Sequence, residues 1–212
     1  ADTNWEIWDV ATGSSALRTL TVATTPNQHA VQLKDGRLFF WAEDRGQIYD
    51  PKTDTLTATA LRAGQPSPAI TLLKDGRVAL IGDDFIYCQA PTIKLYDPIT
   101  DTWTEGPTSC KEPDIRAATT GAGMVLHGYG KTFDPFTSTV AANAIPLTWT
   151  NNANMLGLPD GRVVFVSVGD TKQTLFYDDV TGWSAPSSMT MIREDPGLAP
   201  LPGGRVLVFG GS

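Results

Sequence analysis

The stretch LKDGRLFFWAEDRGQIYDP, residues 33–51, determines the fold, because the chain repeats its two halves along most of its length. The first half is a Lys-Asp-Gly-Arg turn followed by an apolar run. It recurs as LKDGRVALIG at 73–82, LPDGRVVFVS at 158–167 and LPGGRVLVFGG at 201–211, with a weaker copy, GAGMVLHG, at 121–128. The second half ends in Tyr-Asp-Pro. It recurs as YDPIT at 96–100, FDPFT at 133–137 and YDDVTGW at 177–183.

The repeat has the period of a β-propeller blade. Its turn glycines are Gly36, Gly76, Gly123, Gly161 and Gly204, and they lie about 42 residues apart on average. Asp-Gly between apolar runs is a hairpin signal, and Asp-Pro is a second turn signal. Each unit therefore predicts four antiparallel strands, a to d. Strands a and b flank the first turn and form the inner half of a blade; strands c and d flank the second turn and form the outer half.

The two ends of the chain carry complementary halves of one unit. Trp5–Asp9, followed by the turn at 10–13, matches an outer half, whereas Leu201–Phe209 is an inner half. This predicts a single all-β domain over 1–212, a five-bladed propeller closed by its N-terminal strands. The last blade would consist of residues 190–212 plus 1–15, with Trp5–Asp9 paired to the strands of Leu201–Phe209. Five blades lie within the usual range of four to eight.

The repeat resembles that of the Kelch family, in which a glycine pair follows strand b, a Tyr follows, and a Trp comes about six residues later. Tyr96 with Trp103, and Tyr177 with Trp183, match this pattern, and Gly210–Gly211 is a true glycine pair. The resemblance covers the whole chain and implies a Kelch-like propeller. It implies little about function, because one fold hosts many functions.

Composition limits the partners. The net charge of −7 and the pI of about 4.7 argue against nucleic acid, which requires a basic face. Apolar runs stay far below the roughly 18 residues of a membrane span, so no membrane is expected. We expect a monomer. Cys88 and Cys110 fall on two loops of the second unit that share a face, so we predict a disulfide and an extracellular or periplasmic location.

Candidate binding residues gather on the face formed by the b–c and d–a loops, which vary between units, whereas the a–b and c–d turns are repetitive and predicted to be structural. Polar residues open several inner strands beside the axis, and Trp149 lies outside the repeat. The predicted ligand-binding residues are His29, Asp114, Arg116, Trp149, Asn151, Arg193, Glu194 and Asp195. The leading hypothesis is a non-enzymatic binding module for a glycan or a protein. No catalytic residue, metal or cofactor is assigned.

Alternatives remain open. Asp114 with Glu194 or Asp195, beside Arg116 and Arg193, would suit a carbohydrate-active enzyme, since paired carboxylates cleave glycosides when roughly 5–10 Å apart. His29 and His127, near Tyr87 or Tyr129, would suit copper. Copper-radical oxidases with Kelch-type propellers, however, also need a Cys–Tyr crosslink and ligands from a further domain, so copper is not expected here. Finally, the loop face could be a solvated rim with paired arginines, in a structural or interaction propeller without a small-molecule site.

Overall fold

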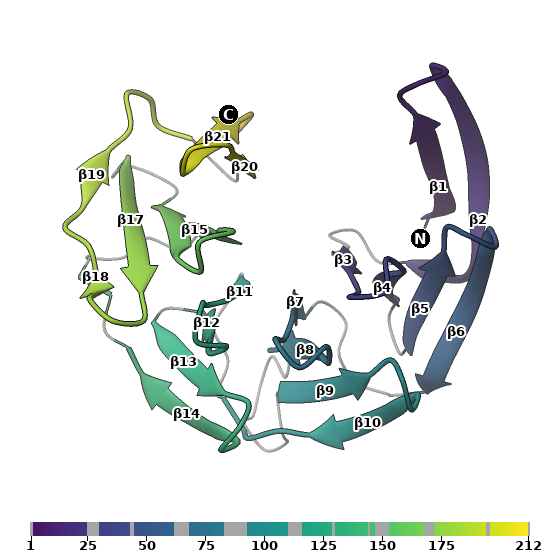
Figure 1. The fold of residues 1–212 in the computed structure, drawn as a ribbon, viewed down its shortest axis with the longest axis horizontal. Coiled ribbons are helices and arrows are strands. Elements are labelled where there is room, and N and C mark those ends of the chain that lie inside the picture. The colour runs from purple at the N-terminus through teal and green to yellow at the C-terminus, as the bar shows by residue number, and fades with distance from the viewer. Residues whose placement is uncertain are drawn as a thin grey trace.

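The computed structural model describes residues 2–24, 30–42, 45–61, 68–82, 93–109, 116–128, 130–143, 145–146, 153–167, 172–193 and 196–211. This part of the chain is all-β, built from antiparallel sheets (Figure 1). Within it, no helix has the length and apolar character needed to cross a membrane.

Four sheets have the predicted order a-b-c-d. Blade 1 contains β3 (Ala30–Gln32), β4 (Leu38–Ala42), β5 (Arg45–Asp50) and β6 (Thr55–Leu61). Blade 2 contains β7 (Ala69–Leu72), β8 (Val78–Ile81), β9 (Ile93–Asp97) and β10 (Thr102–Glu105). Blade 3 contains β11 (Ala117–Thr119), β12 (Val125–His127), β13 (Lys131–Asp134) and β14 (Thr139–Ala142). Blade 4 contains β15 (Ala153–Gly157), β16 (Val163–Ser167), β17 (Gln173–Asp178) and β18 (Gly182–Trp183); β19 (Ser187–Ser188) also pairs with β17.

The repeated turns explain why these strands pair. Gly36 adopts φ +93°, which favours glycine, and its amide donates to the carbonyl of Leu33. The Asp35 carboxylate accepts from the backbone amide of Arg37 and, at 2.8 Å, from its Nε. The same bonds recur between Asp75 and Arg77 and between Asp160 and Arg162. The a–b turns are therefore held by their own side chains, as predicted.

The core lies between the blades. Val78 and Leu80 of β8 are fully buried against Phe39 and Trp41 of blade 1. Ala79 and its neighbours on the opposite face of β8 belong to the cluster shared with blade 3. Because a strand presents successive side chains to opposite faces, a strand between two blades is apolar throughout. The continuous apolar b strands of the sequence are explained by this arrangement.

The blades follow one another around an arc, with β3, β7, β11, β15 and β20 (Gly197–Leu201) nearest its centre (Figure 1). The arc is open between two hairpins. One pairs β1 (Asp2–Asp9) with β2 (Ser14–Thr24), and the other pairs β20 with β21 (Arg205–Phe209).

The predicted pairing of Trp5–Asp9 with Leu201–Phe209 is not present: the two segments belong to separate two-stranded sheets. Strand β1 instead pairs with β2 through the tight turn in which the Gly13 amide donates to the Asp9 carbonyl. This hairpin docks on blade 1, where Trp5 packs on Tyr49 with ring centroids 4.7 Å apart. Local hairpin formation and packing on blade 1 thus replace the expected long-range pairing. The closed ring and the count of five blades are not confirmed.

Candidate functional site

An axial cavity of about 430 Å³ opens at the centre of the arc. Its walls come from the inner strands and the residue just before β11, and they are small or aliphatic apart from one guanidinium. The lining residues are Ala30, Ala69, Ile70, Arg116, Ala117, Met155, Leu156 and Leu198. Small side chains are needed here because the inner strands converge: a Cβ on Gly157 would lie 3.2 Å from the carbonyl oxygen of Thr119.

Arg116 brings charge to this cavity. Its Nε donates to Oδ1 of Asn154 on β15 at 2.8 Å, and Nδ2 of Asn154 donates to the carbonyl of Pro196, just before β20. The half-buried guanidinium is thereby oriented by a chain of hydrogen bonds that joins three neighbouring inner segments. Arginine presents five N–H donors in a planar fork that matches carboxylate geometry. The cavity can therefore take an anionic or carbonyl oxygen beside an apolar body.

Arg193 lies in a different environment. Its Nη1 donates to the carbonyl of Gly210 at 2.5 Å, just beyond the end of β21, and the residue does not line the axial cavity. Of the two predicted arginines, the structure brings only Arg116 to the axis. The contact of Arg193 agrees with the alternative in which a rim arginine is structural.

The remaining predicted site residues lie outside the described residues. They are His29, Asp114, Trp149, Asn151, Glu194 and Asp195, and the same holds for the predicted disulfide between Cys88 and Cys110 and for Tyr87 and Tyr129 of the copper alternative.

Sequence reasoning missed Asn154, which orients Arg116. A signal was present: it is an amide within the inner strand ANMLG, among residues that otherwise suit a crowded axis. It also missed the aliphatic character of the wall, to which Met155 and Leu198 contribute.

His127 is buried, not part of an accessible loop as the copper alternative required. Only 2% of it is exposed, and its Nε2 has no hydrogen-bond partner among the described residues. Burial, with a smaller contribution from the charge of Lys131, lowers the pKa of the imidazole to about 4. Strand alternation places His127 on the same face of β12 as Val125, which is packed in the core shared with blade 2. Within the described ranges, no three His, Cys, Asp or Glu side chains group to hold a metal.

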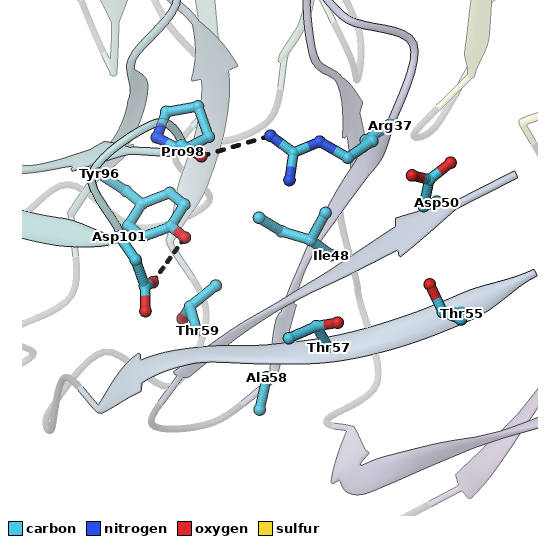
Figure 2. A pocket seen from close by; sticks show the side chains of 10 residues that line it. All are labelled: Arg37, Ile48, Asp50, Thr55, Thr57, Ala58, Thr59, Tyr96, Pro98 and Asp101. Atoms are coloured by element: carbon cyan, nitrogen blue, oxygen red, sulfur yellow. Dashed lines mark hydrogen bonds between the residues drawn. The ribbon is translucent and has the colours of Figure 1, made fainter. Parts of the chain in front are cut away.

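A second pocket, of about 250 Å³, lies between blades 1 and 2 (Figure 2). Arg37 reaches across it to donate from Nη2 to the carbonyl of Pro98 at 3.3 Å. On the wall formed by blade 2, the Tyr96 hydroxyl donates to the Asp101 carboxylate at 2.8 Å. Burial, and then the hydrogen bond to Asp101, raises the pKa of Tyr96 above its usual range, so the phenol is neutral.

The contact that crosses this pocket recurs at the next junction, where Nη2 of Arg77 donates to the carbonyl of Pro135. A contact that repeats with the blades belongs to blade-to-blade packing, which any propeller of this type needs. The axial cavity, with Arg116 on one of its walls, is the better candidate for a site.

No family model matches this sequence, and no curated protein matches it. Solved structures do match in fold. A fungal alcohol oxidase of the AA5 family, in complex with copper, aligns with a TM-score of 0.76 at 14% identity, over 98% of this chain and 52% of that one. An inactive variant of virginiamycin B lyase from Staphylococcus aureus, with quinupristin, aligns with a TM-score of 0.73 at 8% identity, over 98% of this chain and 77% of that one.

A streptogramin B lyase aligns with a TM-score of 0.71 at 15% identity, over 93% of this chain and 66% of that one. At these identities the likeness concerns the fold alone, and it establishes a β-propeller architecture. The chain spans about half the length of the fungal oxidase.

Proposed function

We propose that this chain is a non-enzymatic binding module whose ligand enters the axial cavity and presents an oxygen anion or carbonyl to Arg116. The observation that carries the proposal is a single oriented guanidinium on the wall of an otherwise small and aliphatic cavity. Ligand sites are commonly concave and mostly apolar, with a few placed polar groups that give orientation. The cavity volume also falls within the usual range for such sites.

The lining favours a protein segment over an unmodified glycan. Arg116 presents a planar fork that matches a carboxylate, which a peptide carries and an unmodified glycan lacks, and Ile70, Met155 and Leu198 add aliphatic surface beside it. A peptide with an aliphatic side chain next to a carboxylate satisfies both parts of the wall. The rival sugar-cleaving enzyme would use Arg116 and Arg193 together with Asp114, Glu194 and Asp195. Its carboxylates lie outside the described residues, and Arg193 does not line the cavity.

The test is a peptide-display screen against the whole chain, followed by calorimetry of the selected peptide with the wild type and with Arg116→Gln. We expect Arg116→Gln to weaken binding by about 1–3 kcal/mol, the loss of a charge-assisted hydrogen bond. Arg162→Gln is the matched control, because Arg162 pairs with Asp160 in an exposed a–b turn. Unchanged affinity with a lowered melting temperature would make Arg116 a structural link between inner segments. Selection of a glycan from an array, and of no peptide, would overturn the preference for a protein ligand.

We also propose that the repeats are of the Kelch type. In support, Trp103 packs on Tyr96 and Trp183 packs on Tyr177, with ring centroids 4.8 Å and 5.1 Å apart. Each indole N–H donates to the preceding blade, to the carbonyl of Ala60 and to Oδ1 of Asn143 respectively. The Tyr and Trp of the repeat therefore join neighbouring blades, which explains their spacing. Trp103→Phe and Trp183→Phe should each lower the melting temperature without altering ligand affinity.

A further inference from the structure

The two hairpins at the opening of the arc expose surfaces that are buried at the corresponding positions of blades 1 and 2. Leu207 and Phe209 follow the turn of β20–β21 as Phe39 and Trp41 follow the turn of blade 1. Leu207 and Phe209 are 46% and 51% exposed, whereas Phe39 and Trp41 are 0% and 4% exposed. The corresponding pair in blade 2, Ala79 and Ile81, is fully buried. We call the face of β21 with Leu207 and Phe209 the trailing face.

The hairpin β1–β2 also exposes an apolar side chain, but on the side that would face a preceding blade. Trp8 precedes Asp9 as Tyr49 precedes Asp50 in blade 1. Trp8 is 62% exposed, whereas Tyr49 is 6% exposed and Tyr96, at the same position of blade 2, is 1% exposed. Tyr96 belongs to the cluster that blade 2 shares with blade 1, the blade before it. The position of Trp8 is therefore built to contact a preceding blade. We call this side of β1 the leading face.

The strands that carry the trailing and leading faces, β21 and β1, also have unpaired edges. In every complete blade strand b pairs with strand c: β4 with β5, β8 with β9, β12 with β13 and β16 with β17. In the described part of the chain, β21 is a strand b that pairs with β20 alone, and β1 is a strand c that pairs with β2 alone. An exposed edge beside an apolar face is a template for a further strand.

We propose that the opening binds a polypeptide segment that carries the same repeat in the order outer half, then inner half. Its strand c would pair with β21, and its strand b would pair with β1. Its apolar faces would cover Leu207, Phe209 and Trp8. The proposed interface continues the blade-to-blade interface already present between blades 1 and 2, and it is independent of the ligand in the axial cavity.

A second copy of this chain fits the opening less well. Two copies that joined their complementary half-blades in both directions would form a ring of ten blades, from four complete blades and two half-blades in each. Propellers usually have four to eight blades. Direct closure within one chain would need β1 beside β21, whereas the two hairpins stand apart on either side of the opening (Figure 1).

The chain itself supplies a probe. Residues 131–167 run from β13 through β14 and β15 to β16, which is the order c, d, a, b. We would fuse a second copy of this segment to the C-terminus of the whole chain. The matched control carries proline at the copied positions of Lys131 and Val163, whose amides face the strands b and c outside the segment, because proline cannot donate to a strand ladder.

The expected result is a higher melting temperature and weaker fluorescence of a hydrophobic dye for the fusion than for either the unfused chain or the proline control. Hydrogen exchange at the amides of Val206 and Val208 should slow in the fusion only, because these amides face the open edge whereas those of Leu207 and Phe209 face β20. Equal melting temperatures, dye binding and exchange in the fusion and its proline control would overturn the proposal.

Two results with the unfused chain would also overturn it. A discrete dimer by light scattering would assign the opening to a second copy. A monomer that binds no dye, and that Trp8→Ser and Phe209→Ser each destabilise, would show that the ring closes on itself.

Discussion

Acidification from pH 7.5 to 4.5 should destabilise the chain through His127, and His127→Leu should remove that loss. The pKa of this imidazole is about 4 in the folded chain, whereas an unburied imidazole, as in the unfolded chain, has a pKa of 6.5. The folded state therefore binds fewer protons than the unfolded state between these values. The stability contribution is complete above pH 6.5 and declines as the pH falls towards 4.

The magnitude follows from the two pKa values. Between pH 7.5 and 4.5 the linkage amounts to about 2.5 kcal/mol of unfolding free energy, which corresponds to roughly 5–10 °C in melting temperature for a chain of this size. The side chain is almost fully buried, so little solvent screening is expected. Exposed carboxylates that hold structural turns, such as Asp35 and Asp160, have lowered pKa values and lose their contribution mostly below this window.

The assay is urea denaturation at both pH values for the wild type, His127→Leu and His29→Asn. Leucine removes the titrating group and the unpartnered Nε2 together. We expect His127→Leu to lose about 2.5 kcal/mol less than the wild type on acidification, whereas His29→Asn, which removes the other histidine, should behave as the wild type. The burial argument is refuted if His127→Leu loses as much unfolding free energy on acidification as the wild type, or if NMR titration places the pKa of His127 near 6.5.

Three further predictions concern the repeat and the cysteines. Asp101→Ala should cost about 1–3 kcal/mol of unfolding free energy by denaturation, because it leaves the buried Tyr96 hydroxyl without its acceptor; an unchanged midpoint would contradict this. Gly161→Ala should lower the melting temperature more than Gly36→Ala: both sites have positive φ, but only at Gly161 would a Cβ lie 2.7 Å from the Cα of Gly121. Equal effects would show that backbone strain alone decides. Mass spectrometry without reductant should find the two cysteines joined, and two free thiols would remove the disulfide and weaken the secreted assignment.

The blade architecture could be predicted from sequence because its signals are local. Asp-Gly turns such as Asp35–Gly36 set each inner hairpin, and continuous apolar runs such as 78–81 require a strand between two packed sheets. Ring closure could not be predicted in this way. The sequence shows that 5–9 and 201–209 are each half of a blade, but it does not show which segment pairs with either half.

The site was predicted in part. Arg116 reaches the axial cavity because it directly precedes an inner strand, and this position was visible in the repeat. Arg193 lies four residues before its inner strand β20, and its side chain donates to the carbonyl of Gly210. His127 is buried because alternation along β12 directs it to the core side, whereas its place near a loop suggested exposure. Position in the repeat predicts which segment is near the axis, and the side chain's own contacts decide where it points.

The arginines that cross two of the junctions between blades have a mechanical consequence. Arg37 of blade 1 binds the carbonyl of Pro98 in blade 2, and Arg77 of blade 2 binds the carbonyl of Pro135 in blade 3. When one of these blades unfolds, its neighbour loses a hydrogen bond. Stability is therefore coupled between adjacent blades along the arc, as in a one-dimensional array. Under tension or partial denaturation, rupture should begin at the end hairpins, which have one neighbour each, and advance blade by blade towards the middle.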